Sequence, residues 1–292
     1  MVVADHLAIF VNIIYANPQG FNGPTLIMGT LFFAFQLYCD FSGYTDIALG
    51  SAQVMGINLI ENFQRPYFSK SIAEFWRRWH ISLSSWLRDY VYFPIARSTK
   101  NLTRTKLYGA IIFTFFLIGL WHGAGWNYVI MGLLFGFYIT FSEMTKKYRS
   151  TLTAKIGLDR YPKILNYWRI AVTFVLVCIG WVFFRVNKIS DAWYILSHWQ
   201  VGLGSFIAHA YNYYTWKNLF SLSGLANKGD FVISACGIAI IIIAELIERQ
   251  QTIWQKIALQ KTSVRWLYYY AIIFALVIFA RFGAQQFIYF QF

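Results

Sequence analysis

Long apolar runs separated by short basic segments constrain the fold of this chain more than any other feature of its sequence. A helix needs about 20 mostly apolar residues to cross roughly 30 Å of hydrocarbon. The runs of suitable length are 24–39 (extended irregularly to about residue 55), 167–184, 231–247 and 266–283. Two shorter apolar runs lie at 107–121 and 126–142. The sequence therefore predicts an all-α polytopic membrane protein.

Composition excludes an ordinary soluble domain. The chain is 58% hydrophobic, 21% aromatic and 13% charged, whereas soluble domains carry about 25% charged residues. Its 25 Lys and Arg against 12 Asp and Glu give a formal net charge of +13. Because the basic residues cluster between the apolar runs, they indicate loops at an anionic cytoplasmic lipid surface, and we expect no nucleic acid as a partner. Without repeats or a linker, residues 1–292 are interpreted as a single membrane-embedded domain.

The three cysteines lie inside apolar runs and form neither a disulfide framework nor a metal-binding spacing, so no metal is expected. The basic segments 65–106, 146–169 and 249–265 predict three cytoplasmic regions. The segment 187–230 is poor in basic residues and is expected outside, as is the carboxyl terminus.

Residues 107–142 therefore begin and end on the cytoplasmic side. Each of the two apolar arms is only about 22–26 Å long as a helix. Between them stands the sequence Trp-His-Gly-Ala-Gly-Trp-Asn at 121–127. We interpret this region as a re-entrant hairpin whose tip lies deep in the membrane and lines a cavity. In the alternative, both arms cross fully and His122 lies at the far interface.

Residues 71–93 have a different pattern, typical of an amphipathic helix along the cytoplasmic interface. Ser71 and Glu74 form a capping box, and Pro94 is expected to end the helix. His80 falls at the edge of the apolar face. That face carries Phe75, Trp76, Trp79, Leu83, Trp86, Leu87 and Tyr90.

His122 is the strongest candidate for chemistry, because ionisable groups deep in a membrane are costly and histidine accepts a proton near neutral pH. Gly123 and Gly125 beside it would allow a substrate close to the backbone. The alternative is a structural histidine bonded to a carbonyl group. His80 either lines the mouth of the same cavity or anchors the amphipathic helix.

Four further charged residues have two interpretations each. Asp40 and Asp46 either line the cavity on a helix broken at Ser42-Gly43, or cap a helix or form an ion pair with Arg77 or Arg78. Arg77 and Arg78 bind either the phosphates of a nucleotide-bearing donor or lipid phosphates.

The carboxyl terminus is aromatic to its last residue. Its side chains either form a membrane-interface belt or bring Tyr289 into the cavity from outside.

Four segments together resemble the membrane-bound O-acyltransferase (MBOAT) family, in its bacterial alginate O-acetylase branch. They are Phe-Gln-Leu-Tyr-Cys-Asp-Phe-Ser-Gly-Tyr-Thr-Asp-Ile-Ala at 35–48, Phe-Trp-Arg-Arg-Trp-His-Ile-Ser-Leu-Ser-Ser-Trp-Leu-Arg-Asp-Tyr at 75–90, Leu-Trp-His-Gly-Ala at 120–124, and 286–292. The resemblance implies a helical bundle around a membrane funnel, with His122 as the active-site histidine and His80 as the second family histidine.

The resemblance further implies an O-acyltransferase in the bacterial inner membrane with no bound cofactor. The donor substrate would be a cytoplasmic acyl-CoA, with acetyl expected, and the acceptor an exported cell-envelope polysaccharide. A separate extracytoplasmic acyltransferase protein would be a partner. Residues 2–8 resemble a stretch well inside the family's usual chain, so we expect several N-terminal membrane helices to be missing.

In the mechanism that we expect, a thioester enters along the helix of His80 and Arg77, and His122 is the general base on a hydroxyl. Trp121 excludes water, Asn127 or tip N–H groups are the candidate oxyanion donors, and Tyr289 is a candidate acyl relay. A transporter and a non-catalytic scaffold are the alternative functions.

Overall fold

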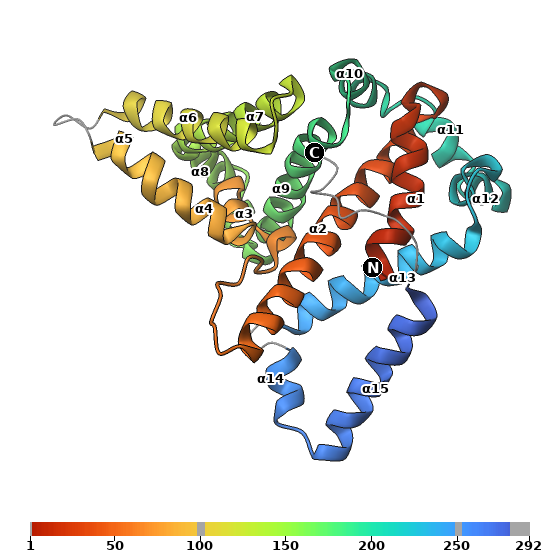
Figure 1. The fold of residues 1–292 in the computed structure, drawn as a ribbon. Helices are drawn as coiled ribbons and strands as arrows, with labels where there is room; N and C mark the ends of the chain where they lie inside the picture. The colour runs from red at the N-terminus through yellow and green to blue at the C-terminus, as the bar shows by residue number, and fades with distance from the viewer. Residues whose placement is uncertain (1, 98–102, 249–252, 281–292) are drawn as a thin grey trace. The chain divides into compact units, whose positions relative to one another are not determined.

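The computed structural model describes residues 2–97, 103–248 and 253–280, which are helical through most of their length (Figure 1). Its α-helices are α1 (Val2–Ala16), α2 (Gly23–Val54), α3 (Ile72–Arg78), α4 (Ile81–Leu87), α5 (Phe93–Arg97), α6 (Arg104–His122), α7 (Trp126–Met144), α8 (Lys146–Lys155), α9 (Pro162–Arg185), α10 (Ile189–His198), α11 (Leu203–Ala208), α12 (Tyr213–Phe220), α13 (Lys228–Ile247), α14 (Ile253–Ala258) and α15 (Thr262–Phe279). A π-helical segment, Arg88–Tyr92, joins α4 to α5. The ranges described contain no strand beyond an isolated bridge between Phe63 and Trp79.

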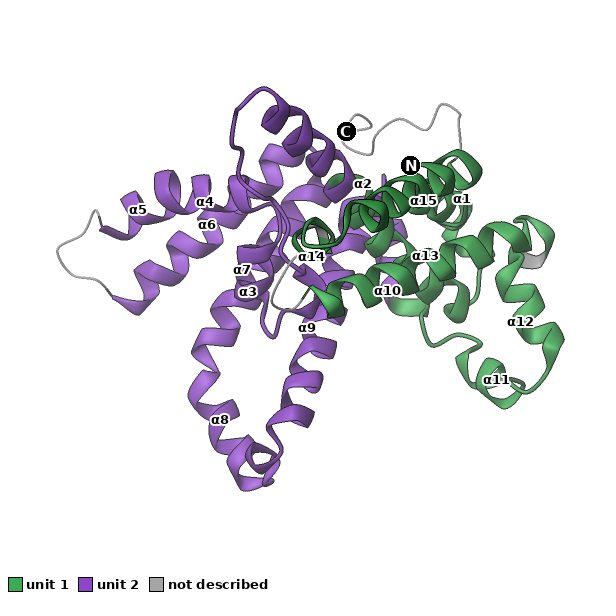
Figure 2. Cartoon of the chain, turned by 90° about the horizontal axis from the view of Figure 1, so that it is seen from below, with its two compact units in different colours: residues 1–41, 197–291 green, residues 42–196, 292 purple. Residues whose placement is uncertain are grey.

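Two compact units make up the chain, coloured separately in Figure 2. The first unit comprises residues 1–41 and 197–291, and the second comprises residues 42–196 with residue 292. In the first unit, α1 packs on α13 so closely that a Cβ at Gly237 would lie 2.7 Å from the side chain of Val3. The second unit holds α3 to α9 and is the unit that carries the site.

The predicted membrane spans are confirmed. The four runs predicted to span correspond to α2, α9, α13 and α15, each long and apolar enough to cross a membrane, and α6, predicted to be a short arm of the hairpin, passes the same test. The helix α7 passes the same test together with α8, from which it bends by 58°. The chain is therefore a multi-pass, all-α membrane protein.

The helix α2 runs without interruption through Ser42 and Gly43, so the break considered at that position is wrong. Asp40 and Asp46 lie inside the helix rather than at an end, and the interpretation as helix caps is wrong as well. A lone glycine costs a helix only about 1 kcal/mol, which the apolar residues on both sides offset.

The segment 71–97 begins as predicted but is not one helix. Ser71 accepts a hydrogen bond from the Glu74 N–H at 3.1 Å, and the Glu74 carboxylate accepts one from the Lys70 N–H at 2.9 Å. The helix α3 then ends at Arg78, because Trp79 is extended and His80 is left-handed. The apolar face of α3 packs against protein: the Trp76 ring lies 5.3 Å from Phe115 on α6 and 5.2 Å from Phe135 on α7.

After the break between α3 and α4, the side chains of the predicted apolar face are no longer all buried. Leu87 is buried, whereas Trp86 and Tyr90 are 55% and 69% exposed. The expectation that Pro94 ends the helix is also wrong, since α5 continues to Arg97. The π-helical turn before it, in which the Phe93 N–H bonds to the Arg88 carbonyl, is wider than an α-turn and leaves room for the proline ring.

The predicted hairpin is present as α6 and α7, joined by residues 123–125. Glycines let the two helices approach: a Cβ at Gly119 would lie 2.5 Å from the Tyr128 carbonyl oxygen, and one at Gly132 would overlap the Phe115 carbonyl oxygen. Each arm has 19 residues, or about 28 Å of helix. That length fits a complete crossing as well as a re-entrant hairpin.

Candidate active site

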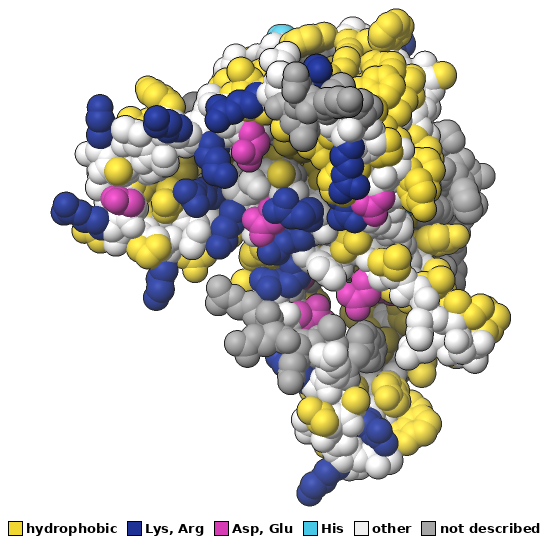
Figure 3. Space-filling model, turned by 90° about the vertical axis from the view of Figure 1, so that its left-hand side faces the viewer, with side chains coloured by type: hydrophobic (Ala, Val, Ile, Leu, Met, Phe, Trp, Pro, Cys, Tyr) yellow, Lys and Arg dark blue, Asp and Glu magenta, His cyan; other side chains and the backbone are white. Residues whose placement is uncertain are grey.

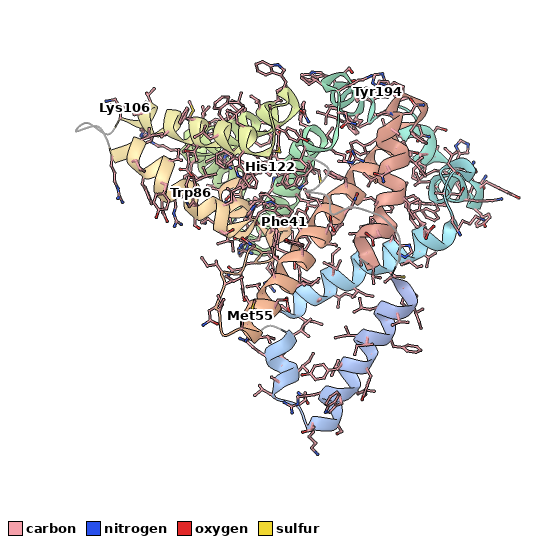
Figure 4. All side chains as sticks on the ribbon, viewed as in Figure 1. Phe41, Met55, Trp86, Lys106, His122 and Tyr194 are labelled. Carbon is pink, nitrogen blue, oxygen red and sulfur yellow. The ribbon has the colours of Figure 1, made fainter. Side chains whose placement is uncertain are left out.

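His122 is the last residue of α6, at the hairpin tip, with Lys106 at the other end of the helix (Figure 4). Its ring lies 4.8 Å from that of Trp121 and 5.1 Å from that of Phe184 on α9. His122 as a whole residue is of intermediate burial, and its ring packs edge-on against Phe184. The basic ends of both arms point away from the tip, which agrees with placing both on one side of the membrane.

The tip is fastened to the carboxyl end of α9. Asn127 is buried, and its side-chain amide donates a hydrogen bond to the Val186 carbonyl at 3.0 Å. The tip is therefore level with the end of a 24-residue helix, which agrees with the alternative in which both arms cross fully. Trp76 on α3 packs against Phe115 of α6. Phe115 precedes His122 by about 10 Å along the helix axis.

His80 occupies the break between α3 and α4 in a left-handed conformation, with φ 45° and ψ 55°. This conformation costs a residue with a Cβ about 1–2 kcal/mol. Asn62 holds it in place: the Asn62 carboxamide oxygen accepts hydrogen bonds from the N–H and hydroxyl of Ser82, at 3.0 and 2.7 Å. The Asn62 carbonyl also accepts the N–H of Ile81 at 3.1 Å.

Burial lowers the pKa of His80 to about 4, so the ring is neutral at physiological pH. The Ser82 hydroxyl donates a hydrogen bond to the Asn62 carboxamide oxygen, and its oxygen lies 3.4 Å from His80 Nδ1. The arrangement thus favours the tautomer with the proton on Nδ1, which leaves Nε2 as a proton acceptor.

The Trp121 ring contacts the rings of both histidines. Its ring lies 5.8 Å from His80 and 4.8 Å from His122, edge-on in both cases. The structure therefore brings together three of the residues singled out from sequence, His80, Trp121 and His122, with Asn127 one short loop away. Because Trp121 is 55% exposed and its ring contacts both imidazoles, it is placed to shield them from water.

The glycines of the tip do not offer the backbone to a substrate, contrary to expectation. The Tyr128 ring already lies beside Gly123, 2.7 Å from where a Cβ would stand, and the Asn127 side chain fills the corresponding space at Gly125. Small residues are needed here for packing within the hairpin.

The two arginines differ in their surroundings. Arg78 forms an ion pair with Glu74 at 2.6 Å and donates to the Arg65 carbonyl at 3.4 Å. Arg77 is exposed and lines a cavity of about 300 Å³ between α3–α4 and the hairpin. Figure 3 shows Lys and Arg side chains gathered on one face among apolar ones.

The cavity approaches the histidines along one stripe of α6. Ile111, Thr114 and Ile118 line it, and His122 follows Ile118 by one helical turn on the same side. Ile81, next to His80, lines it as well.

The remaining predicted site residues are Asp40, Asp46 and Tyr289. Asp46 is exposed on α2 in the second unit, and Asp40 belongs to the first unit. Tyr289 lies outside the described residues.

Sequence reasoning missed Asn62, Ser82 and Phe184. Asn62 lies outside the predicted helix 71–93, so no local signal connects it with His80. Phe184 is one of many aromatic residues in an apolar run, and its contact with His122 depends on how α9 packs.

A protein-family model described as the membrane-bound O-acyltransferase family matches residues 2–186, a range that includes both histidines and Asn62. The chain belongs to the membrane-bound O-acyltransferase family. The family assigned from the sequence segments is thereby confirmed.

The relatives of this MBOAT chain include proteins named as three different transferases. It is 40% identical over 191 residues to the Probable alginate O-acetylase of Pseudomonas aeruginosa, covering 65% of this chain and 34% of that protein. It is 36% identical over 207 residues to the Peptidoglycan O-acetyltransferase of Helicobacter pylori, covering 70% and 36%. It is 36% identical over 171 residues to the Teichoic acid D-alanyltransferase of Bacillus subtilis, covering 54% and 41%. The aligned region spans about a third of the length of the first two relatives.

Proposed function

We propose that this MBOAT chain transfers an acyl group, acetyl in the first instance, from a cytoplasmic thioester to hydroxyl groups of an exported cell-envelope polysaccharide. The observation that carries the proposal is the group of His80, Trp121 and His122 at the hairpin tip. Two imidazoles that both contact one exposed indole supply a proton acceptor and a cover against water.

In the proposed reaction, His122 takes the proton of the acceptor hydroxyl as its oxygen attacks the thioester carbonyl. The carbon–sulfur bond breaks, the thiolate leaves, and the proton passes from His122 to the thiolate, giving an ester and a free thiol. General base catalysis of this kind contributes about 10²- to 10⁴-fold in rate. His80, neutral at physiological pH, serves as the second polar group at the site.

The developing negative charge on the carbonyl oxygen needs a hydrogen-bond donor. One amide proton of Asn127 is engaged by Val186, so its second proton and the backbone N–H groups of the tip are the proposed donors.

For the donor we propose acyl-CoA, with acetyl-CoA as the test substrate, and no bound cofactor. Arg77 and Arg78 are the proposed contacts for its phosphates. Lipid phosphate is the competing anion for these two arginines.

The names of the relatives support an envelope polymer as acceptor, since they refer to alginate, peptidoglycan and teichoic acid. We place the chain in the bacterial cytoplasmic membrane as one acyltransferase domain with a family-type funnel. The proposal includes an extracytoplasmic acyltransferase as partner and Tyr289 as an acyl relay to it. Replacing Tyr289 by Phe tests the relay, which unchanged polymer acylation would exclude.

The experiment for the proposed function follows the acyl group. Membranes from a host without related enzymes, with and without the chain, are given acetyl-CoA labelled in the acetyl group. We expect label to appear as base-labile ester on the polymer and free CoA to accumulate in equal amount. Polymer or solute movement with the thioester left intact would instead identify a transporter.

A further inference from the structure

The first unit contains a buried pair of ionisable side chains that the proposed acyl transfer does not use. His6 on α1 is 5% exposed and Asp230 on α13 is 8% exposed. The His6 Nδ1 lies 2.9 Å from the Asp230 carboxylate, and its Nε2 lies 3.2 Å from the Phe279 carbonyl oxygen at the end of α15. One imidazole ring therefore connects three helices of this unit, α1, α13 and α15 (Figure 2).

The two hydrogen bonds determine how many protons the pair holds. A carbonyl oxygen can only accept, so His6 Nε2 carries a proton that it donates to Phe279. A second proton lies between Nδ1 and the carboxylate, because two unprotonated atoms at 2.9 Å would repel each other. The count is two whichever partner holds the second proton. A pair with one proton fewer can keep only one of the two bonds, since a neutral imidazole has a single N–H.

The bond that breaks in that case is the bond to Phe279. A hydrogen bond to an ionised group is about twice as strong as one between neutral groups, so the remaining N–H stays on the carboxylate. Asp230 also stands in the first turn of α13, where the helix dipole favours a negative charge. The carbonyl at the end of α15 is therefore released first.

The helix α15 has no other polar tie to the helices around His6. None of its residues is buried. Within the described ranges, its aromatic rings contact only one another, and its one hydrogen bond to α1, α2 or α13 is the bond from His6 to Phe279. The protonation of one buried pair therefore decides whether the carboxyl end of α15 is tied to α1 and α13.

We propose that the His6–Asp230 pair is a proton-dependent latch for the carboxyl end of α15. With two protons, the pair holds the Phe279 carbonyl and the latch is closed. As the pH rises, one proton passes to water, the bond to Phe279 breaks and the latch opens. The start of α13 and the end of α15 are both predicted outside, so the latch responds to the pH of the outer compartment.

No second charge on the surrounding helices takes part in the latch. Besides Asp230, the charged residues that these helices contribute to the first unit are Asp5, Asp40, Lys228, Glu245 and Arg265. None of these side chains, and no tyrosine or cysteine of the described residues, bonds to the imidazole. The number of protons on this one pair is therefore what sets the state of the latch.

Hydrogen exchange of the full chain in lipid nanodiscs, read by mass spectrometry, tests the proposal. The measured quantity is the exchange rate of residues 276–280, the last turn of α15, divided by that of residues 266–272 in the same helix. The division cancels the chemical dependence of exchange on pH. Between about pH 6 and pH 8.5, we expect this ratio to rise about two- to tenfold in the wild type, as the loss of one hydrogen bond allows.

The variant Asp230→Asn distinguishes a latch from an ordinary structural ion pair. Its carboxamide can donate to Nδ1 of a neutral imidazole, whose Nε2 proton then stays on Phe279. We expect a low ratio at every pH for Asp230→Asn, and a high ratio at every pH for His6→Phe, which has neither nitrogen. His209→Gln replaces an exposed histidine of the same unit and is the control, which should follow the wild type.

A ratio that does not change with pH in the wild type would overturn the proposal. An Asp230→Asn variant with the high ratio of His6→Phe would overturn it as well, because the pair would then act through its charge and not through its proton count. If His6→Phe fails to fold, the comparison of wild type with Asp230→Asn decides alone. The assay involves no turnover, so its outcome is independent of the proposed acyl transfer.

Discussion

Replacing His80 by glycine, alanine and asparagine separates the imidazole from the backbone conformation that it adopts. His80 is left-handed, with φ 45° and ψ 55°, and this costs a residue with a Cβ about 1–2 kcal/mol. Glycine adopts the conformation freely, asparagine tolerates it, and alanine has no compensating side chain.

We therefore expect His80→Gly to unfold with a free energy about 1 kcal/mol higher than His80→Ala, and His80→Asn to lie between them. The loss of the edge-on contact with Trp121 is common to all three, so it cancels in the comparison. Denaturant or thermal unfolding in detergent measures this order.

Acyl transfer by the same variants should follow a different order. If the imidazole participates in the reaction, all three lose activity together, by about 10²-fold or more, regardless of stability. Full activity in His80→Gly would refute this reasoning and would show that His80 only shapes the turn between α3 and α4. Equal stability of the glycine and alanine variants would refute the strain at this position.

Four further predictions follow from the packing and the titration. Asn62→Ala removes the two hydrogen bonds from Ser82 and should lower the unfolding free energy by about 1–3 kcal/mol. Asn62→Asp keeps the acceptor oxygen and should recover most of this loss. An alanine variant as stable as the wild type would show that Asn62 does not hold the turn at His80. The pKa of His80 falls from 6.5 to about 4 on folding, so below pH 6.5 the unfolded chain binds a proton that the folded chain does not. The unfolding free energy therefore decreases as the pH falls from 6.5 towards 4, by no more than about 3 kcal/mol. The difference in stability between wild type and His80→Asn, measured from pH 7 to 4.5, should shrink accordingly, and a constant difference would refute it. Gly132→Ala should force α6 and α7 apart and cost about 1–3 kcal/mol, whereas Gly109→Ala, with open space around its Cβ, should be neutral or stabilising. His6→Ala should cost about 1–3 kcal/mol, because it removes the hydrogen bond between His6 Nδ1 and the buried Asp230 carboxylate at 2.9 Å; an unfolding free energy equal to that of the wild type would show that this bond contributes little.

The features predicted well from sequence depend on local pattern. Apolar run length located the spans, and the spacing of Ser71 and Glu74 located the start of α3. Two apolar arms around a glycine-rich tip predicted the hairpin. Each of these signals is contained within a short window, so no knowledge of tertiary packing was needed.

The features missed depend on contacts between distant segments. The left-handed turn at His80 exists because Asn62 and the bridge between Phe63 and Trp79 hold it, and periodicity alone favours a straight helix there. Pro94 is tolerated only because a wider turn precedes it. The depth of His122 along α9 is likewise set by the bond from Asn127 to Val186.

The central claim is that the His122 imidazole at the hairpin tip accepts the acceptor's proton. The initial rate of acetyl transfer from the thioester to the polymer, in membranes holding equal amounts of folded wild type and His122→Ala, tests it most directly. His209→Ala, which removes an exposed histidine of the first unit, is the control and should match the wild type. We predict a rate lower by about 10²- to 10⁴-fold for His122→Ala; a rate equal to that of the wild type would contradict the account.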